Sequence, residues 1–230
     1  MESITFGTII ENLTHSTNIG YYMIHLERAT EREPLIKQLE NNLKIKLNIF
    51  PAADGHKLIK DGHPTTCQQR GPPATRGAGD IGCTVSHVNI CKDAIEKNYD
   101  YIVILEDDCE FISDLSSLNN IINDYNNLKL QWDLFLLGYE QEKGYNLPGT
   151  NFRKVSRFNL THSVVLNRTF MEELIKTYEE YYNNNTTLSI DTMYSNVIEN
   201  NSLNAYGHIY SNNMFIQKPG MYSYIVERVR

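Results

Sequence analysis

The sequence predicts an α/β protein built on an open, mostly parallel β-sheet with helices on both faces. Short apolar runs of strand length alternate with longer segments whose apolar residues recur at helical spacing. One of these runs, residues 101–105 (YIVIL), is apolar at every position, which is typical of a central parallel strand covered on both faces. Alternating strands and helices form a sheet of this kind because each crossover lays a helix over the strands.

The individual elements follow from local patterns along the chain. Strands are expected at residues 21–26, about 46–50, 101–105, about 133–137 and 162–166, and helices at about 30–43, 80–98, 115–128 and 169–182. Ahead of the helix that Asp80 is expected to cap, repeated Gly and Pro residues indicate a ligand-dependent loop. Residues 1–19 are expected to be a loosely attached leader and residues 20–230 a single domain.

The composition argues against several classes of protein. The chain has 230 residues, 41% of them hydrophobic, and a formal net charge of -7. Because its basic residues are scattered, nucleic acid is not an expected partner. We expect no membrane span and a cytoplasmic location, since no run approaches roughly 18 to 20 apolar residues and no secretion signal is visible. The four cysteines form no CxxC pair, so free thiols are expected rather than disulfides.

Three acidic residues, Glu106, Asp107 and Asp108, directly follow the strand at 101–105. Ligands of open α/β sheets bind beyond the carboxyl ends of the strands, and adjacent acids there repel one another unless a cation or donor groups lie between them. Glu106 and Asp108 face the same way if the chain stays extended, whereas Asp107 points elsewhere. Since Mg²⁺ and Mn²⁺ favour carboxylates, this pair is a candidate bridge between a metal ion and a diphosphate. The alternative is that Asp107 and Asp108 cap a turn while Glu106 is solvated.

Five motifs occur in an order and spacing that resemble glycosyltransferase family 25. They are YYMIHLERATER (21–32), AADG (52–55), GDIGCTVSH (79–87), YIVILEDD (101–108) and WDLFLLG (132–138). That family includes bacterial lipopolysaccharide glycosyltransferases and collagen galactosyltransferase domains. The resemblance is strongest over about residues 21–140 and continues more weakly through 161–166, 189–194 and 215–223.

The resemblance implies a GT-A type, Rossmann-like fold that transfers a hexose, glucose or galactose, from a UDP-sugar to a hydroxyl group of a glycan or protein. It also implies inversion at the anomeric carbon and a Mn²⁺ or Mg²⁺ cofactor. The acid run would be the family's form of the D-x-D motif, with Asp108 on the metal and Glu106 near the metal or the donor ribose. The residues that match donor-binding positions are Arg28, Arg32, Asp54, Gly55, Ser86, His87, Glu106 and Asp107.

Three later residues are candidates for the remaining roles. Asp191 matches a late Ile-Asp element of the family and is the first candidate for the general base or for acceptor binding, and its alternative role is a first-turn acid of a helix. Glu140, just past the strand at about 133–137, is the rival candidate for the base. His208 is the candidate third metal ligand.

A helical pattern of possible soft-metal ligands also occurs in the sequence. Cys83, His87 and Cys91 recur every four residues and would share one helix face. At about 1.5 Å rise per residue the outer two lie roughly 12 Å apart, too far for one zinc ion with bonds of about 2.0 to 2.3 Å. Cys83 and Cys91 are therefore expected to be core thiols, while His87 is either a donor contact or a structural histidine.

Other residues with suitable chemistry have two interpretations each. Arg70 and Arg76, in the Gly/Pro loop, either move onto a diphosphate or stay solvated. Trp132 and Tyr139 flank a predicted strand, and they either stack on a sugar or belong to the core.

Three alternative functions also place acids after a buried strand. A phosphatase of the haloacid dehalogenase type requires an Asp nucleophile where this chain has Glu106. A nucleotidyltransferase on a similar sheet would release pyrophosphate. A catalytically inactive domain would bind a sugar nucleotide without transferring the sugar.

Overall fold

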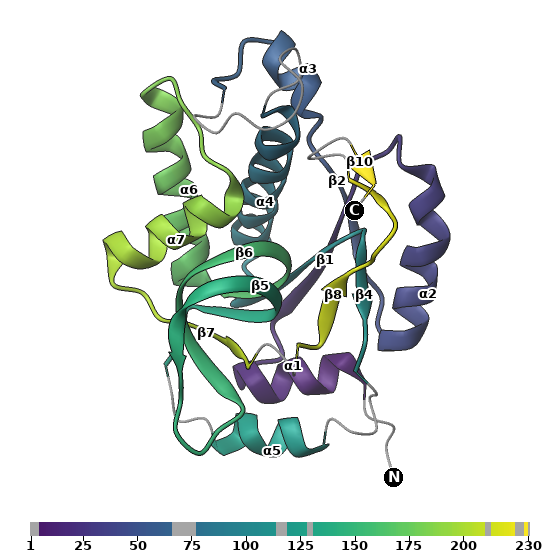
Figure 1. Ribbon diagram of the computed structural model, residues 1–230, viewed down its shortest axis with the longest axis vertical. Helices are drawn as coiled ribbons and strands as arrows, with labels where there is room; N and C mark the ends of the chain where they lie inside the picture. Colours follow the sequence, from purple (N-terminus) through teal and green to yellow (C-terminus); the bar gives the residue numbers. More distant parts are fainter. Residues whose placement is uncertain are drawn as a thin grey trace.

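The computed structural model describes residues 5–65, 77–113, 119–127, 131–209, 213–223 and 228–229 (Figure 1). Its centre is a six-stranded sheet with the order β2-β1-β3-β6-β5-β7. The strands are β1 (Ile19–His25), β2 (Asn48–Pro51), β3 (Tyr101–Glu106), β5 (Leu134–Asn146), β6 (Phe152–Asn167) and β7 (Ala205–His208). Three of the five neighbouring pairs among these described strands are parallel, β1 with β2, β1 with β3 and β5 with β7. The predicted mostly parallel sheet is therefore confirmed.

β6 is the antiparallel member of the sheet, because it returns from β5 through a short turn at residues 147–151. β5 and β6 extend well beyond the strands predicted at 133–137 and 162–166 and form a two-stranded ribbon over their outer halves. The first residues of β6, Phe152 to Val155, also pair with β7. This ribbon was not predicted, since its side chains are largely polar and its register shifts at several points.

Helices cover both faces of the sheet, as expected (Figure 1). One face carries α1 (Phe6–Thr14), α2 (Glu33–Leu43) and α5 (Asn119–Asn127), and the other carries α4 (Ala78–Glu96), α6 (Arg168–Asn183) and α7 (Ile190–Asn201). β3 supplies side chains to both layers. Ile102 and Ile104 pack with α4, α6 and α7, whereas Val103 and Leu105 pack with α1 and α2. This alternation explains why every position of the YIVIL run is apolar, and Tyr101 is the only one of the five that is partly exposed.

Shorter elements surround the carboxyl ends of the parallel strands. They are η1 (Thr30–Arg32), α3 (Gly55–Lys60), the antiparallel pair of β4 (Cys109–Phe111) with β8 (Phe215–Gln217), and the pair of β9 (Tyr222–Ser223) with β10 (Arg228–Val229). The β4–β8 pair brings the last part of the chain beside the acid run that ends β3.

The N-terminal segment corrects one expectation. Residues 6–14 form α1, and its apolar side chains Phe6, Ile9, Ile10 and Leu13 are buried in the core. The Thr5 side chain accepts a hydrogen bond from the Thr8 backbone N–H and caps the helix. The segment is therefore an integral core helix and not a loosely attached leader, because its apolar residues share one face at spacings of three and four.

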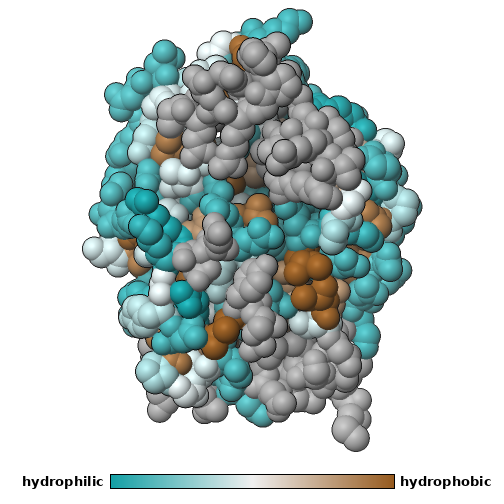
Figure 2. Space-filling model, in the orientation of Figure 1, coloured by the Kyte–Doolittle hydropathy of each residue, from teal (hydrophilic) through white to brown (hydrophobic). Residues whose placement is uncertain are grey.

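The described surface is mainly hydrophilic. Figure 2 shows one face of the molecule, on which hydrophobic residues appear in small separate groups. Among described residues the large hydrophobic side chains that remain exposed are Ile49, Ile112, Tyr145 and Tyr182. None of the described helices is long and apolar enough to cross a membrane.

Candidate functional site

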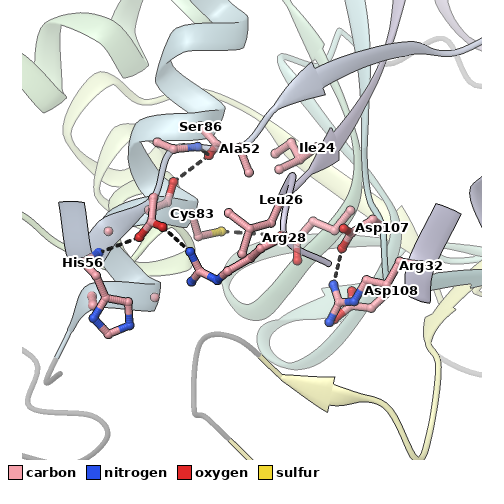
Figure 3. A pocket seen from close by; sticks show the side chains of 17 residues that line it. Ile24, Leu26, Arg28, Arg32, Ala52, His56, Cys83, Ser86, Asp107 and Asp108 are labelled. Carbon is pink, nitrogen blue, oxygen red and sulfur yellow. Dashed lines mark hydrogen bonds and ion pairs between the residues drawn. The ribbon is translucent and has the colours of Figure 1, made fainter. Parts of the chain in front are cut away.

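A cleft opens beyond the carboxyl ends of β1, β2 and β3, where α3 and α4 begin (Figure 3). We call it the strand-end cleft. Its apolar wall is formed by Ile24, Leu26, Ala52 and Ala53. Its charged lining comprises Arg28, Arg32, Asp54, Glu106, Asp107 and Asp108. Parallel strands end at one edge of the sheet, and this is where the sequence predicted a ligand site.

Asp107, the middle acid of the run, is bound by the side chains of Arg32 and His25. The guanidinium of Arg32 donates to the Asp107 carboxylate, and His25 Nδ1 lies 2.8 Å from Asp107 Oδ2. Arg32 and Asp107 are 5% and 7% exposed, so the pair is buried. His25 reaches Asp107 because β1 and β3 are parallel with Ile24 opposite Glu106. Asp107 and Arg32 line the cleft, but their charges are largely committed to each other.

Asp108 is held from the other side of the turn. Gln217 of β8 donates through Nε2 to Asp108 Oδ2 at 3.2 Å, and the Lys218 N–H donates to the Asp108 carbonyl at 2.7 Å. Arg32 Nη2 lies 3.8 Å from Asp108 Oδ2. Asp108 is only 8% exposed and lines the cleft, so its carboxylate is fixed at the cleft wall.

Glu106 is the acceptor at the centre of a mixed polar cluster. Its Oε1 atom lies 3.7 Å from Cys83 Sγ, 3.4 Å from His87 Nε2 and 3.5 Å from Thr161 Oγ1. The other ring nitrogen of His87, Nδ1, lies 2.8 Å from Tyr194 Oη. His87 is fully buried and does not line the cleft, and it contacts the cleft-lining residue Glu106 instead.

The Cys83 thiol is held in its neutral form. Burial, followed by the negative charges of Glu106, Asp191 and Asp80, raises the pKa of Cys83 well above its usual range. Sequence reasoning expected a core thiol here, and the structure instead gives Cys83 a place in the cleft lining. Cys91, two turns further along α4, is fully buried in the apolar core, as expected.

Two glycines allow the walls of the cleft to approach each other. A Cβ atom added at Gly82 would lie 2.6 Å from the Ala53 carbonyl oxygen, and one at Gly55 would lie 1.6 Å from the Ala78 carbonyl oxygen. Ser86 joins the same two segments by hydrogen bonds. Its Oγ accepts from the Ala53 N–H at 2.8 Å and donates to the Gly82 carbonyl at 2.6 Å. The backbones of the AADG and GDIGCTVSH motifs are therefore in close contact.

Arg28 and Asp54 form an ion pair at the rim of the cleft (Figure 3). Asp54 also caps α3, accepting from the His56 N–H at 3.0 Å. Partial burial raises the pKa of Asp54, but Arg28 and the N–H groups of α3 outweigh it and hold that pKa below its usual range. The Arg28 side chain is 43% exposed, which leaves it room to turn towards a ligand.

The two candidates for the base occupy different places. Asp191 lies in the first turn of α7, where its Oδ1 accepts from the Thr192 N–H at 3.0 Å, and its charge acts on Cys83. Asp191 is not among the residues that line the strand-end cleft. Glu140 is exposed on β5, opposite Asn159 of β6, and does not line the cleft.

His208 does not support the expected role of a metal ligand. It is fully buried among aromatic rings, with Nε2 2.7 Å from Tyr125 Oη and ring contacts to Phe135 and Phe152. Burial lowers its pKa to about 4, so the ring is neutral near pH 7. Because it is packed inside the core and lines no part of the cleft, the structure assigns it a core role.

Two further expectations concern aromatic and loop residues. Trp132 and Tyr139 belong to the core, and the Tyr139 hydroxyl donates to the His208 carbonyl at 2.5 Å. Arg70 and Arg76 lie outside the described residues.

A second groove lies between the β5–β6 ribbon and α7. Its lining residues are Lys143, Arg157, Phe158, Asn159, Thr192, Ser195 and Asn196. The groove is polar, and Lys143 faces Arg157 across the two strands. Thr192 follows Asp191 directly, so α7 borders this groove and carries the candidate base.

Sequence reasoning missed four residues that contact the acid run. They are His25, Cys83, Thr161 and Gln217. His25 and Thr161 lie within matched motifs but have no charge signal of their own, and Gln217 is 109 residues from the acid it binds. For these four residues the only sequence signal was the spacing of four between Cys83 and His87, which places both on one helix face.

Comparison with known proteins gives the family. The family model described as glycosyltransferase family 25 (LPS biosynthesis protein) matches residues 18–227. Procollagen galactosyltransferase 1-A of Xenopus laevis is 31% identical over 170 residues, which cover 67% of this chain and 28% of that protein. Procollagen galactosyltransferase 1-B of the same organism is 30% identical over 153 residues, 60% of this chain and 24% of that protein. The chain thus spans about a quarter of the length of these relatives, 28% and 24%.

One solved structure aligns with most of the chain. A glycosyltransferase involved in the glycosylation of the major capsid of PBCV-1 aligns over 88% of this chain and 93% of that one, with a TM-score of 0.49 and 11% identity. The family model, by contrast, matches nearly the whole sequence and includes every residue of the strand-end cleft. The chain therefore belongs to glycosyltransferase family 25.

Proposed function

We propose that this chain transfers a hexose, glucose or galactose, from a UDP-sugar to a hydroxyl group of a glycan or protein, with inversion and with the help of a divalent metal ion. The observation that carries the proposal is the strand-end cleft, which combines an apolar wall, a fixed acid run and arginines at one edge of the sheet. A cytoplasmic location is part of the same proposal.

The nucleotide end of the donor fits the apolar part of the cleft. Ile24, Leu26 and Ala52 offer an apolar surface for a flat base. A larger side chain at one of these positions would fill the space that we propose for the base.

The diphosphate end fits the acid run. Glu106 and Asp108 both line the cleft and offer the oxygen atoms that Mg²⁺ and Mn²⁺ prefer, so these two residues would hold the ion. A bound ion would neutralise the charge that develops on the departing diphosphate. Asp107 orients the turn by binding Arg32. Arg28, half-exposed at the rim, would exchange Asp54 for a phosphate oxygen when the donor binds.

The acceptor side is assigned to α7. Inversion in one step requires a base within hydrogen-bonding reach of the attacking hydroxyl, on the face of the sugar opposite the leaving group. Asp191 is the acid of α7 that acts on the cleft lining, and the polar groove beside Thr192 offers space for an acceptor glycan. Glu140 lies on β5, opposite Asn159 of β6, and is the second candidate for the base.

The test uses the donor alone, because slow hydrolysis of a sugar nucleotide does not require a known acceptor. UDP-glucose, UDP-galactose and GDP-mannose are incubated with the chain and Mn²⁺, and the released nucleotide is identified. We expect UDP from one UDP-hexose, and the first-formed sugar should have the inverted anomeric configuration by NMR. Chelation of the metal should abolish the release.

Other products would contradict specific parts of the proposal. Release of hexose 1-phosphate, together with UMP where water is the acceptor, would indicate nucleotidyl transfer. Tight donor binding by calorimetry without any turnover, with a panel of glycan acceptors present, would indicate a binding domain. Equal donor affinity with and without chelator would remove the metal from the mechanism.

A further inference from the structure

A donor set of different chemistry lies at the inner side of the strand-end cleft. Cys83 and His87 are one turn apart on the same face of α4, and Glu106 reaches them from the end of β3. One ligand atom from each residue lies within 4.8 Å of the other two. We infer that the Cys83–His87–Glu106 cluster is a binding site for a thiophilic divalent cation, represented by Zn²⁺, which would bind Cys83 as the thiolate and displace the thiol proton to solvent. This inference rests on the cluster itself and not on the proposed transfer of a sugar.

The distances match a tetrahedral site. With bonds of about 2.0 to 2.3 Å, tetrahedral geometry separates neighbouring N, O and S ligands of Zn²⁺ by roughly 3.4 to 3.6 Å. Glu106 Oε1 lies 3.4 Å from His87 Nε2 and 3.7 Å from Cys83 Sγ. Two edges of the tetrahedron are therefore already near their final lengths. Cys91, the third residue of the helical pattern, is too far along α4 to join this site, and Glu106 at the end of β3 is the third ligand instead.

Groups outside the cluster hold two of its three ligands in position. Tyr194 Oη lies 2.8 Å from His87 Nδ1, which leaves Nε2 facing the cluster. Tyr194 is itself fixed, because it is fully buried and its ring packs edge-on against Phe170. Thr161 Oγ1 donates to Glu106 Oε1 at 3.5 Å. A hydrogen-bond partner on the far nitrogen is the usual way in which proteins orient a metal-binding imidazole.

The cluster is open on one side and lies in negative surroundings. Cys83 and Glu106 line the cleft, whereas His87 is fully buried, so a fourth ligand would come from the cleft side. Asp80 and Asp191 act on Cys83 in addition to Glu106, so a dication would enter a site of negative charge. These softer donors suit Zn²⁺ or Co²⁺ better than Mg²⁺. Since Glu106 also belongs to the acid run, a thiophilic ion here would displace a hard ion from that run.

Cobalt substitution tests the site without any nucleotide sugar. Co²⁺ is titrated into the full chain under reducing conditions, and the near-ultraviolet absorption of a Co²⁺–thiolate bond is followed. We expect one Co²⁺ per chain with this absorption, complete displacement by Zn²⁺, and loss of the absorption in Cys83→Ser. Cys91→Ser and Cys67→Ser are the matched controls and should retain it. Tyr194→Phe should retain the absorption and weaken affinity about tenfold, the lower end of the effect of losing such a partner.

A second measurement needs no variant, in case Cys83→Ser fails to fold. X-ray absorption spectroscopy of the Zn²⁺-loaded chain should show one sulfur ligand near 2.3 Å with nitrogen or oxygen ligands at about 2.0 to 2.1 Å. Absence of the thiolate absorption, its survival in Cys83→Ser, or a zinc shell without sulfur would overturn the inference. In each of those cases the cluster is a hydrogen-bonded support for Glu106. Donor hydrolysis is measured separately, so failure of one proposal does not imply failure of the other.

Discussion

Arg32 donates to the carboxylate of Asp107 inside the protein, while the neighbouring Asp108 is bound by Gln217 from the opposite side. The acid run is thus held by two separate parts of the chain, and its outer residues Glu106 and Asp108 line the cleft with Asp107. The resemblance to the family had suggested that Arg32 binds the donor. Its burial at 5% exposure favours a role in positioning the acids.

Removing one member of this buried pair should strongly destabilise the fold. Arg32→Met leaves the Asp107 charge buried with only His25 beside it, and we expect a loss of about 3 to 5 kcal/mol in the free energy of unfolding. Urea denaturation measures the loss. The matched control is Arg168→Met, which breaks the exposed pair with Glu172 and should cost less than about 1 kcal/mol. Equal effects of the two substitutions would show that the Arg32 pair is not a structural element.

Asp108→Asn should lower activity without unfolding the chain. Asparagine retains the shape and an oxygen atom for Gln217, but it removes a charge that we assign to the metal ion. We expect turnover of the donor to fall at least about a hundredfold, the scale of losing one stabiliser of developing charge. Glu110→Gln, on β4 and outside the cleft lining, is the control and should keep near-normal turnover. Near-normal turnover of Asp108→Asn at saturating metal would make the acid run structural.

Asp191→Asn should spare the binding of the nucleotide sugar and abolish transfer. Loss of a general base usually lowers the rate by about 10² to 10⁴, whereas loss of a favourable charge in the first turn of α7 changes stability by at most about 1 kcal/mol. Donor affinity, turnover and melting temperature are measured on the same protein. Glu140→Gln is the comparison, and we expect little change because that side chain is exposed outside the cleft. If only Glu140→Gln loses turnover, the two roles are exchanged.

Gly82→Ala should damage the cleft through the backbone. The added Cβ would lie 2.6 Å from the Ala53 carbonyl oxygen, so the loop before α3 must move away from α4. We expect a loss of about 1 to 3 kcal/mol in stability, together with weaker donor binding by calorimetry. Gly7→Ala in α1 is the control, because its nearest atoms would be 3.4 to 3.7 Å away. That substitution should be neutral or should stabilise the helix by up to about 1 kcal/mol.

The buried His208 should make stability depend on pH between about 6.5 and 4. Its pKa in the folded state is about 4, below the ordinary value of 6.5, so the unfolded chain binds this proton more readily. The stabilisation is fully present above pH 6.5 and is lost as the pH falls towards 4, by about 3 kcal/mol in total. His208→Gln should show correspondingly less acid sensitivity than the wild type in urea titrations at several pH values. His15→Asn, at an exposed position, should match the wild type.

The sequence was sufficient for β1, β2, β3 and the inner parts of β5 and β6, and for the location of the cleft. The YIVIL run predicted β3 because a strand covered on both faces must be apolar on both, and its acidic end marked the edge where ligands bind. Asp54, Gly55 and Ser86 also lie in or beside the cleft, as their motifs suggested.

The features that the sequence analysis assigned wrongly or did not predict have physical reasons. His208 was considered as a ligand because its residue type suits metals, but burial among aromatic rings depends on pairing between β5, β6 and β7 that no local pattern reveals. The helix at residues 6–14 was overlooked because it precedes the first strand, although its apolar residues have helical spacing. The cluster around Glu106 joins a helix and a strand, so its spacing could not be read along the chain.

The β4–β8 pair also bears on the order in which the molecule folds. Gln217 contacts Asp108 across a sequence separation of 109 residues, and Lys218 follows it directly, whereas β1, β2 and β3 can pair before that segment has left the ribosome. Contacts of long range form slowly, because the entropy of closing the intervening loop must be lost first. We therefore expect the sheet to assemble early and the acid run to reach its final geometry late, so that a nascent chain lacking residues 215–218 has a folded sheet beside an unfinished turn.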